Sequence, residues 1–229
     1  FQVDPDAETV EFMGFLMEDI QRVWDSEFEA VGLTYQYTSM VIFEDSVSTG
    51  CGNATSAVGP FYCPAPGDNR VYIDLQFYNE LSRKFGAPGD FAQAYVIAHE
   101  VGHHLQSVLG ISDQVRNAQT RNPGAKNELS VRQELQADCF AGVWAASANE
   151  RTTTRGEPII EEGDIREGLV AAAAVGDDRI QSQAGMQVDP HTWTHGSAEA
   201  RQAWFMQGFR TGDPESCDTY AVSSDEVGL

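Results

Sequence analysis

Basic residues are scarce in this chain. Its 229 residues include 14 lysines and arginines against 35 aspartates and glutamates, and the only lysines are Lys84 and Lys126. The formal net charge of -21 argues against nucleic acid and anionic membrane surfaces as partners, because the chain would repel their phosphates. The acidity is equally compatible with a cationic substrate, with high solubility and with a saline habitat.

Long apolar runs, repeats and linkers are also absent. No run of 18 or more apolar residues occurs, so the sequence predicts no membrane span. No linker rich in proline, glycine and serine divides the chain, and we therefore expect a single domain over residues 1–229. Because the chain begins with Phe1 and not with methionine, we expect that a signal or a membrane anchor has been removed.

Histidine is rare as well, yet two of the five histidines frame the motif His99-Glu100-Val101-Gly102-His103. On a helix, residues i and i+4 lie on one face, so both imidazoles can reach a single Zn²⁺. Glu100 would face the zinc-bound water and act as its general base. The alternative is a core helix whose histidines are only hydrogen-bonded.

The residues around this motif predict a buried helix over 91–109. Asp90 is a suitable N-cap, and Gly110 stands at the C-terminal stop position. Gly102 inside a helix costs about 1 kcal/mol relative to alanine, which indicates close backbone packing at that point. His104 projects about 100° away from its neighbour and is not counted as a ligand.

A catalytic zinc needs a third protein ligand. Metzincins are excluded, because Gln106 and Leu109 stand where that class has glycine and its third histidine. Glu134 and Asp138 share one face of a second predicted helix, 129–148. We favour Glu134 as the third ligand and Asp138 as the acceptor for the outer N–H of a zinc histidine. The alternative is an ordinary solvated acidic face.

A second histidine pair, His191 and His195, also has the i, i+4 spacing. The proline, threonines, glycine and serine around it predict a loop that leads to a helix N-cap, so we do not expect a second metal site. His195 could instead donate a hydrogen bond to the oxyanion of the tetrahedral intermediate, opposite Glu100. A loop histidine without a role is the open alternative.

Four cysteines allow three pairings. Cys51 and Cys63 bracket a short turn-rich segment, which favours a local disulfide and leaves Cys139 with Cys217. Such a pair of disulfides predicts an oxidising compartment outside the cytoplasm. The alternative is four reduced cysteines packed as small apolar groups.

The remaining pattern predicts an α+β fold, mostly α, with a small sheet beside the histidine helix. Apolar periodicity predicts further helices over 6–31, 76–85, 163–175 and 197–210, and strands over 35–43 and 71–75. The segment 151–163 reads as a long loop between helices. We expect the strand at 71–75 to be the sheet edge that pairs with an extended substrate.

Several motifs, in order, resemble the bacterial family named "putative neutral zinc metallopeptidase". They cover 51–52, 59–64, 71–75, 89–104, 134–139, 176–178 and 194–197. The resemblance implies a zincin fold of the gluzincin type, with zinc on His99, His103 and Glu134 and with Glu100 as general base. That family generally has an N-terminal membrane anchor, so the resemblance implies secretion or release from the anchor. Asp177 and Asp178 lie in a shared motif, and we expect them to stabilise a loop or a helix end.

The sequence thus predicts a secreted zinc peptidase, an endopeptidase that holds one Zn²⁺ and cleaves a peptide or protein substrate. Two alternatives remain: an extracytoplasmic zinc-stabilised binding or scaffolding protein without turnover, and a zinc amidohydrolase that is not a peptidase. A fourth coordination position closed by protein would favour the binding protein. Glu100 argues against that alternative, because a purely structural site has no obvious use for it.

Overall fold

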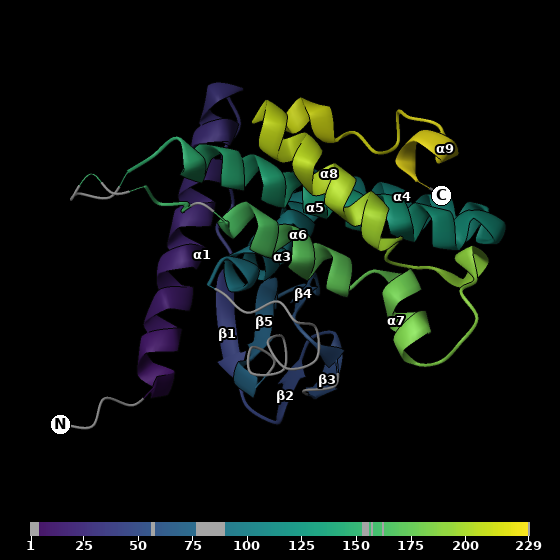
Figure 1. Cartoon of the computed structure of the whole chain (residues 1–229), viewed down its shortest axis with the longest axis horizontal. Helices are drawn as coiled ribbons and strands as arrows, with labels where there is room; N and C mark the ends of the chain where they lie inside the picture. The colour runs from purple at the N-terminus through teal and green to yellow at the C-terminus, as the bar shows by residue number, and fades with distance from the viewer. Residues whose placement is uncertain are drawn as a thin grey trace.

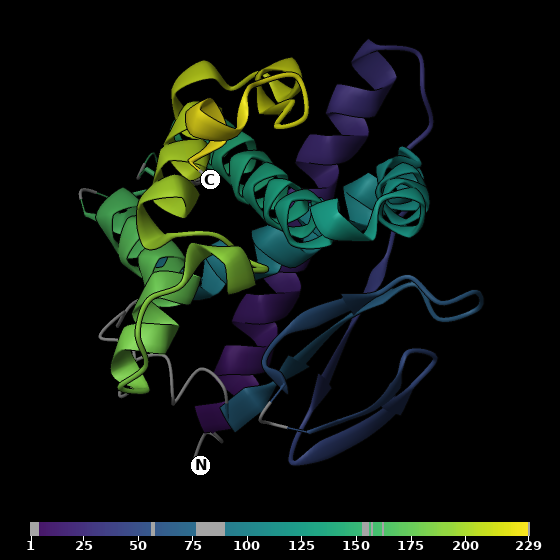
Figure 2. The same cartoon turned by 90° about the vertical axis from the view of Figure 1, so that its right-hand side faces the viewer.

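A computed structural model describes residues 5–55, 58–76, 90–152, 156, 158–161 and 163–228. Helices form most of it, and a small sheet lies at one side (Figures 1 and 2). This confirms the expected mostly α, α+β composition. The elements are α1 (Pro5–Ala30), β1 (Ser39–Phe43), β2 (Ser46–Thr49), β3 (Gly52–Thr55), β4 (Phe61–Cys63), β5 (Arg70–Asp74), α3 (Asp90–Val108), α4 (Ile111–Arg121), η3 (Pro123–Ala125), α5 (Lys126–Asn149), α6 (Asp164–Ala174), α7 (Asp177–Gln183), η4 (Pro190–Thr192), α8 (Ala198–Thr211), η5 (Pro214–Cys217) and α9 (Ser224–Val227).

The three-stranded sheet has the order β1-β5-β4. β1 runs parallel to β5, and β4 runs antiparallel to β5 on its other side. The expectation that the strand at 71–75 is an edge is therefore wrong, because β5 pairs on both sides. Of the described strands in this sheet, β1 and β4 are the outer ones, and β4 is the one beside the histidine helix.

Helix α3 carries the two motif histidines through the centre of the molecule. It contacts α1, α4, α5, α6 and the strands β4 and β5, and most of its residues are buried. The predicted buried helix is confirmed, although it begins at Asp90 and not one residue later. Gly110 adopts φ +74°, a left-handed conformation that glycine tolerates, and it separates α3 from α4.

Glycines set the distance between the three helices that carry the site. A Cβ on Gly102 would lie 2.9 Å from the Cα of Ala137 on α5, which explains the glycine in the motif. Between α5 and α8, a Cβ on Gly142 or on Gly208 would collide with the backbone of the opposite helix. These close approaches hold α3, α5 and α8 in fixed relation to one another.

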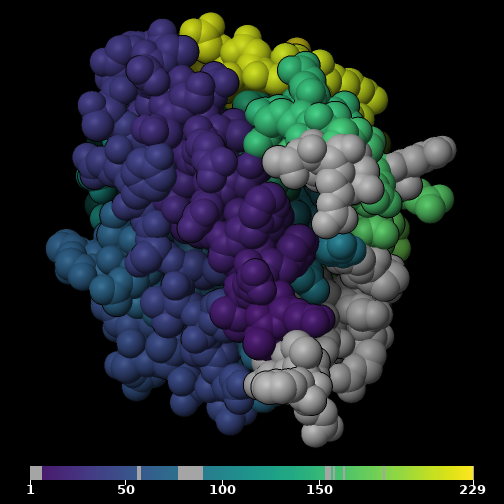
Figure 3. Space-filling view, turned by 90° about the vertical axis from the view of Figure 1, so that its left-hand side faces the viewer, coloured from purple at the N-terminus to yellow at the C-terminus, as the bar shows by residue number. Residues whose placement is uncertain are grey.

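Helix α1 lies along one outer face of the molecule (Figure 3). It buries Met13, Ile20 and Trp24, and the Trp24 ring meets Phe140 of α5 edge to face at 5.4 Å. Asp19, also buried on this helix, accepts hydrogen bonds from a tryptophan of α5 and from an arginine just beyond α5. The predicted long amphipathic helix over 6–31 is thus confirmed to within one residue at each end.

Other predicted elements have mixed outcomes. The helices expected at 163–175 and 197–210 appear as α6 and α8, and the strand expected at 35–43 is shorter, as β1. The expected helix over 76–85 lies, apart from residue 76, outside the described residues. Helices α4 and α7 and the β2–β3 hairpin were not expected. Only Val115 of α4 is buried, and most residues of this helix are polar, so it offers few apolar residues that could reveal it in the sequence.

Both expected disulfides are present, and no free cysteine remains among the described residues. Cys51–Cys63 ties the turn between β2 and β3 to β4. Cys139–Cys217 ties α5 to η5 near the C-terminus. Within the described ranges, no helix combines the length and apolarity that a membrane crossing requires.

Candidate metal centre

A cavity of about 630 Å³ lies beside α3, bounded by α5, by the segment leading into β4 and by the loop before α8. Five residues predicted for the site line it together, from three parts of the chain: His99, Glu100 and His103 of α3, Glu134 of α5 and His195 of the loop. The structure therefore gathers the predicted ligands, base and loop histidine in one place.

The imidazoles of His99 and His103 both direct Nε2 toward the carboxylate of Glu134. The Nε2 of His99 lies 3.3 Å from Glu134 Oε2, and the Nε2 of His103 lies 3.4 Å from Oε1. One ligand atom from each residue falls within 4.8 Å of the others, and no other such cluster of three occurs among the residues described. These three side chains could hold one metal ion.

Asp138 fixes the orientation of His99, in the arrangement that the sequence predicted. The Nδ1 of His99 lies 2.8 Å from Asp138 Oδ1, so it can donate to the carboxylate and leave Nε2 free. Arg201, which sequence reasoning missed, binds the same carboxylate through Nε and Nη2 at 2.8 and 2.9 Å. The hydroxyl of Tyr95 donates to it at 2.5 Å. All four side chains are buried.

Gln106 holds His103 in a similar way. Its Oε1 lies 2.9 Å from His103 Nδ1, so the outer nitrogen of this imidazole has an acceptor as well. In the sequence, Gln106 served only to exclude metzincins. Its three-residue spacing after His103, which puts both on one helix face, is the signal that could have identified it.

The charges of the site favour a cation. Burial lowers the pKa of His99, but the Asp138 carboxylate raises it to about 10. Burial likewise lowers the pKa of His103, and Glu134 raises it above its ordinary value. Burial raises the pKa of Glu134, yet the two histidines hold it well below its usual range. The cluster therefore attracts positive charge, either as protons on the imidazoles or as a divalent cation that displaces them.

Glu100 is buried, with 7% of its surface exposed, and this burial raises the pKa of its carboxyl. Glu100, Glu134 and Asp138 bring three carboxyl groups to the site, and the buried guanidinium of Arg201 offsets part of their charge. The remaining excess of acidic groups favours a divalent ion. Two imidazole nitrogens with one carboxylate form a donor set that zinc accepts in catalytic sites, so the residues fit a zinc ion.

The second histidine pair, His191 and His195, does not form a common site, as expected. His191 lies in η4 and is exposed, whereas His195 reaches the cavity. Asp177 holds the loop: its Oδ2 accepts the backbone N–H groups of Thr194, His195 and Gly196 at 2.7, 2.6 and 3.0 Å. Its Oδ1 lies 3.2 Å from His195 Nδ1, which leaves Nε2 of this ring free.

The two adjacent aspartates therefore stabilise a loop and a helix end. Asp178 accepts the backbone N–H of Ala198, the first residue of α8, at 2.8 Å. The sequence predicted that this loop leads to a helix N-cap, and Ser197 is that N-cap: its side chain accepts from Ala200 N. The contact between Asp177 and the His195 ring was not expected, because the two residues are 18 positions apart.

Two imidazoles and a glutamate that converge on a cavity match the ligand set of mononuclear zinc hydrolases. The sequence matches the model of the family described as "Putative neutral zinc metallopeptidase" over residues 2–220, and the chain belongs to this family.

Relatives of the chain occur in Escherichia coli and in Mycobacterium tuberculosis. The protein YpfJ of Escherichia coli is 48% identical over 217 residues, which are 94% of this chain and 73% of that protein. The protein Rv2575 of Mycobacterium tuberculosis is 48% identical over 194 residues, 82% of this chain and 64% of that protein. Both carry the name "Uncharacterized protein". No solved structure matches the chain. The zincin fold of the gluzincin type therefore stays a prediction.

Proposed function

We propose that this chain is a zinc-dependent peptidase, in which His99, His103 and Glu134 hold one Zn²⁺. The observation that supports this proposal most strongly is the convergence of one ligand atom from each of the three side chains within 4.8 Å of one another, on a cavity that Glu100 also lines. The outer nitrogens of both imidazoles have acceptors, so Nε2 of each ring is free to bind the ion.

Zinc, when bound, would make a water molecule more acidic and polarise the carbonyl of the substrate. Glu100 is the residue of this chain that takes the proton from the attacking water and delivers it to the leaving amine. Its burial raises the pKa of its carboxyl, which suits a group that must both accept and release a proton.

His195 stabilises the negative charge that develops on the carbonyl oxygen. The hydrogen bond to Asp177 raises the pKa of His195, which favours an imidazolium whose Nε2–H can donate to the oxyanion. Asp177 acts as a positioning residue, because it binds the ring and three backbone N–H groups of the loop that carries it.

The substrate is a peptide or protein chain that lies along β4. Among the described strands, β4 pairs with β5 alone, and residues Phe61, Tyr62 and Pro64 line the cavity. A free strand edge can pair with an extended peptide through main-chain hydrogen bonds. The edge that we first expected at 71–75 is therefore replaced by its neighbour β4.

We further propose that the chain acts outside the cytoplasm as a single domain. The two disulfides support an oxidising compartment, because such bonds rarely persist in the cytosol. Residues from Met13 to Val227 join one continuous core, which supports one folding unit.

The substitution Glu100→Gln tests this function. It removes the base but none of the three ligands, so we expect zinc content to stay at the wild-type level and hydrolysis of a peptide library, followed by mass spectrometry, to disappear. Glu11→Gln, the same exchange on the exposed side of α1, is the matched control and should cleave normally. A chelator should stop the wild-type reaction. Unchanged cleavage by Glu100→Gln would contradict the mechanism.

A further inference from the structure

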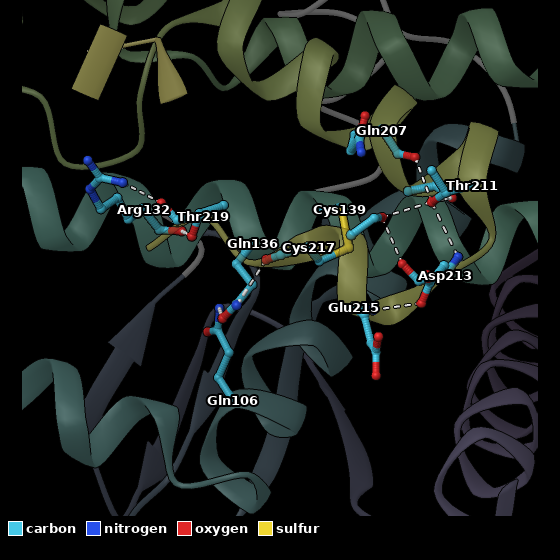
Figure 4. The surroundings of a disulfide bond; sticks show 12 residues. Gln106, Arg132, Gln136, Cys139, Gln207, Thr211, Asp213, Glu215, Cys217 and Thr219 are labelled. Carbon is cyan, nitrogen blue, oxygen red and sulfur yellow. Dashed lines mark hydrogen bonds between the residues drawn. A yellow bond between two sulfur atoms is a disulfide. The ribbon is translucent and has the colours of Figure 1, made fainter. Parts of the chain in front are cut away.

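A chain of buried amides links the second disulfide to the metal centre. It starts at the main-chain carbonyl of Cys217, passes through Gln136 of α5 and Gln106 of α3, and ends at the ring of His103 (Figure 4 shows the part from Cys217 to Gln106). Gln106 is 0% exposed and Gln136 5%, so neither amide can exchange these partners for bulk water.

The main-chain carbonyl of Cys217 fixes the direction of every hydrogen bond in this series of amides. A main-chain carbonyl can only accept, so Gln136 must turn its Nε2 toward Cys217 O, at 3.0 Å. Its Oε1 then faces Gln106 and accepts from Gln106 Nε2 at 3.1 Å. The same Nε2 donates to Gln133 O at 2.7 Å, a second carbonyl that can only accept.

Because the Nε2 of Gln106 donates to two oxygens, Gln136 Oε1 and Gln133 O, the other end of this amide, Oε1, faces His103. An oxygen in that place can only accept, so His103 carries its proton on Nδ1 and keeps the lone pair of Nε2 on the side of Glu134. Asp138 imposes the same tautomer on His99 with a charge. For His103, the uncharged side-chain amides of Gln136 and Gln106 impose this tautomer, because their hydrogen bonds all point in one direction.

The starting carbonyl is itself held firmly. The Cys139–Cys217 disulfide anchors it to α5 at its own residue. Two residues further on, Arg132 donates to Thr219 O, and the hydroxyl of Thr219 donates to Arg132 O at 2.7 Å (Figure 4).

We propose that Gln106 and Gln136 are positioning residues that select the metal-binding tautomer of His103, with the disulfide-anchored carbonyl of Cys217 as their fixed end. This inference rests on the proposed zinc site. It assigns a role to the C-terminal segment around Cys217. This segment contributes none of the three proposed ligands, yet it sets the direction of the two amides that orient His103. The Gln106 amide also donates to Gln133 O, so it keeps part of its orientation without Gln136, and Gln136 contributes less than Gln106 to the choice of tautomer.

The test is the zinc affinity of purified chains, measured by competition with a chromophoric chelator. Gln106→Met keeps the length of the side chain and removes its polar atoms, and we expect zinc binding to weaken by about 10-fold to 100-fold. Gln136→Met should weaken it less, in the same direction.

Gln21→Met is the matched control. Gln21 is as buried as Gln136, at 5%, and its Oε1 accepts from Thr38 N at 2.7 Å, but it belongs to α1 and has no link to His103. This variant should lose stability in thermal unfolding and keep its zinc affinity.

Each outcome decides the matter. Wild-type affinity in Gln106→Met and Gln136→Met would overturn the inference, and so would an equal loss in Gln21→Met, since the loss would then reflect destabilisation alone. If Gln106→Met does not fold, Gln136→Met decides by the same criterion. A wild-type chain that binds no zinc would refute the proposed function, which is a different result from wild-type binding that the substitutions leave intact.

Discussion

Replacing Arg201 by methionine should destabilise the protein severely. Arg201 is 3% exposed and makes two hydrogen bonds to Asp138, which is 0% exposed. Its Nη2 also lies 3.2 Å from the Tyr95 hydroxyl and 4.0 Å from Glu134 Oε2. The substitution therefore takes from a fully buried carboxylate the larger of its two positive partners and leaves it the His99 imidazole alone, with a second carboxylate nearby. Loss of one partner from a buried ion pair costs about 3–5 kcal/mol.

For a chain of this size, 1 kcal/mol corresponds to about 2–4 °C in Tm, so we expect Arg201→Met to lower Tm by about 6–20 °C. The assay is thermal unfolding followed by circular dichroism, with a chelator present so that metal binding does not contribute. Arg210→Met, on the exposed side of the same helix, is the matched control and should change Tm little.

The same measurement on a double variant isolates the ion pair. Once Asp138→Asn has removed the charge, Arg201→Met should cost much less than it does in the wild type, because the carboxylate that accepts both hydrogen bonds of Arg201 is gone and only Glu134, at 4.0 Å, remains. If Arg201→Met unfolds no earlier than Arg210→Met, or if its cost is the same with and without the Asp138 carboxylate, the electrostatic reasoning is refuted.

Three further predictions concern other parts of the molecule. Gly102→Ala should cost about 1–3 kcal/mol of stability in denaturant unfolding, because its methyl would meet the backbone of Ala137; unchanged stability would show that α3 and α5 separate easily. Asp177→Asn should move the alkaline limb of the pH profile of kcat/KM to lower pH, because the carboxylate that raises the pKa of His195 is gone; an unmoved limb would exclude this histidine as the donor. Asp19→Asn should flatten the acid side of the stability profile. Burial raises the Asp19 pKa, but hydrogen bonds from a guanidinium and an indole lower it overall. The stabilisation from this carboxylate is therefore complete above the ordinary pKa of 3.8 and disappears as pH falls through the lower pKa of the folded state. Equal acid sensitivity in the variant would contradict this.

The helices that carry the ligands were predictable from local patterns. The motif at 99–103 needs a helix for its spacing to have a use, and Gly110 ends that helix by adopting a conformation that other residues avoid. Gly102 also indicated close backbone packing at its position, although not that α5 is the partner. Glu134 and Asp138 could be proposed as partners of the histidines because they share one face of one helix.

Contacts between distant segments could not be obtained in this way. Arg201 could be placed on a predicted helix, but nothing in its neighbourhood indicates that α8 packs so closely on α5 that its guanidinium reaches Asp138. The contact of Asp177 with His195 depends on how a loop folds back onto α7. The error over the sheet edge has the same origin, since the apolar alternation of β5 shows that it is a strand but not how many neighbours it has.

Metal analysis of the purified wild-type chain and of Glu134→Ala tests the central claim most directly. If His99, His103 and Glu134 hold the ion, the wild type should contain about one zinc per chain and the variant almost none, while circular dichroism shows both to be folded. Full retention of zinc by Glu134→Ala would contradict this account and place the third ligand elsewhere.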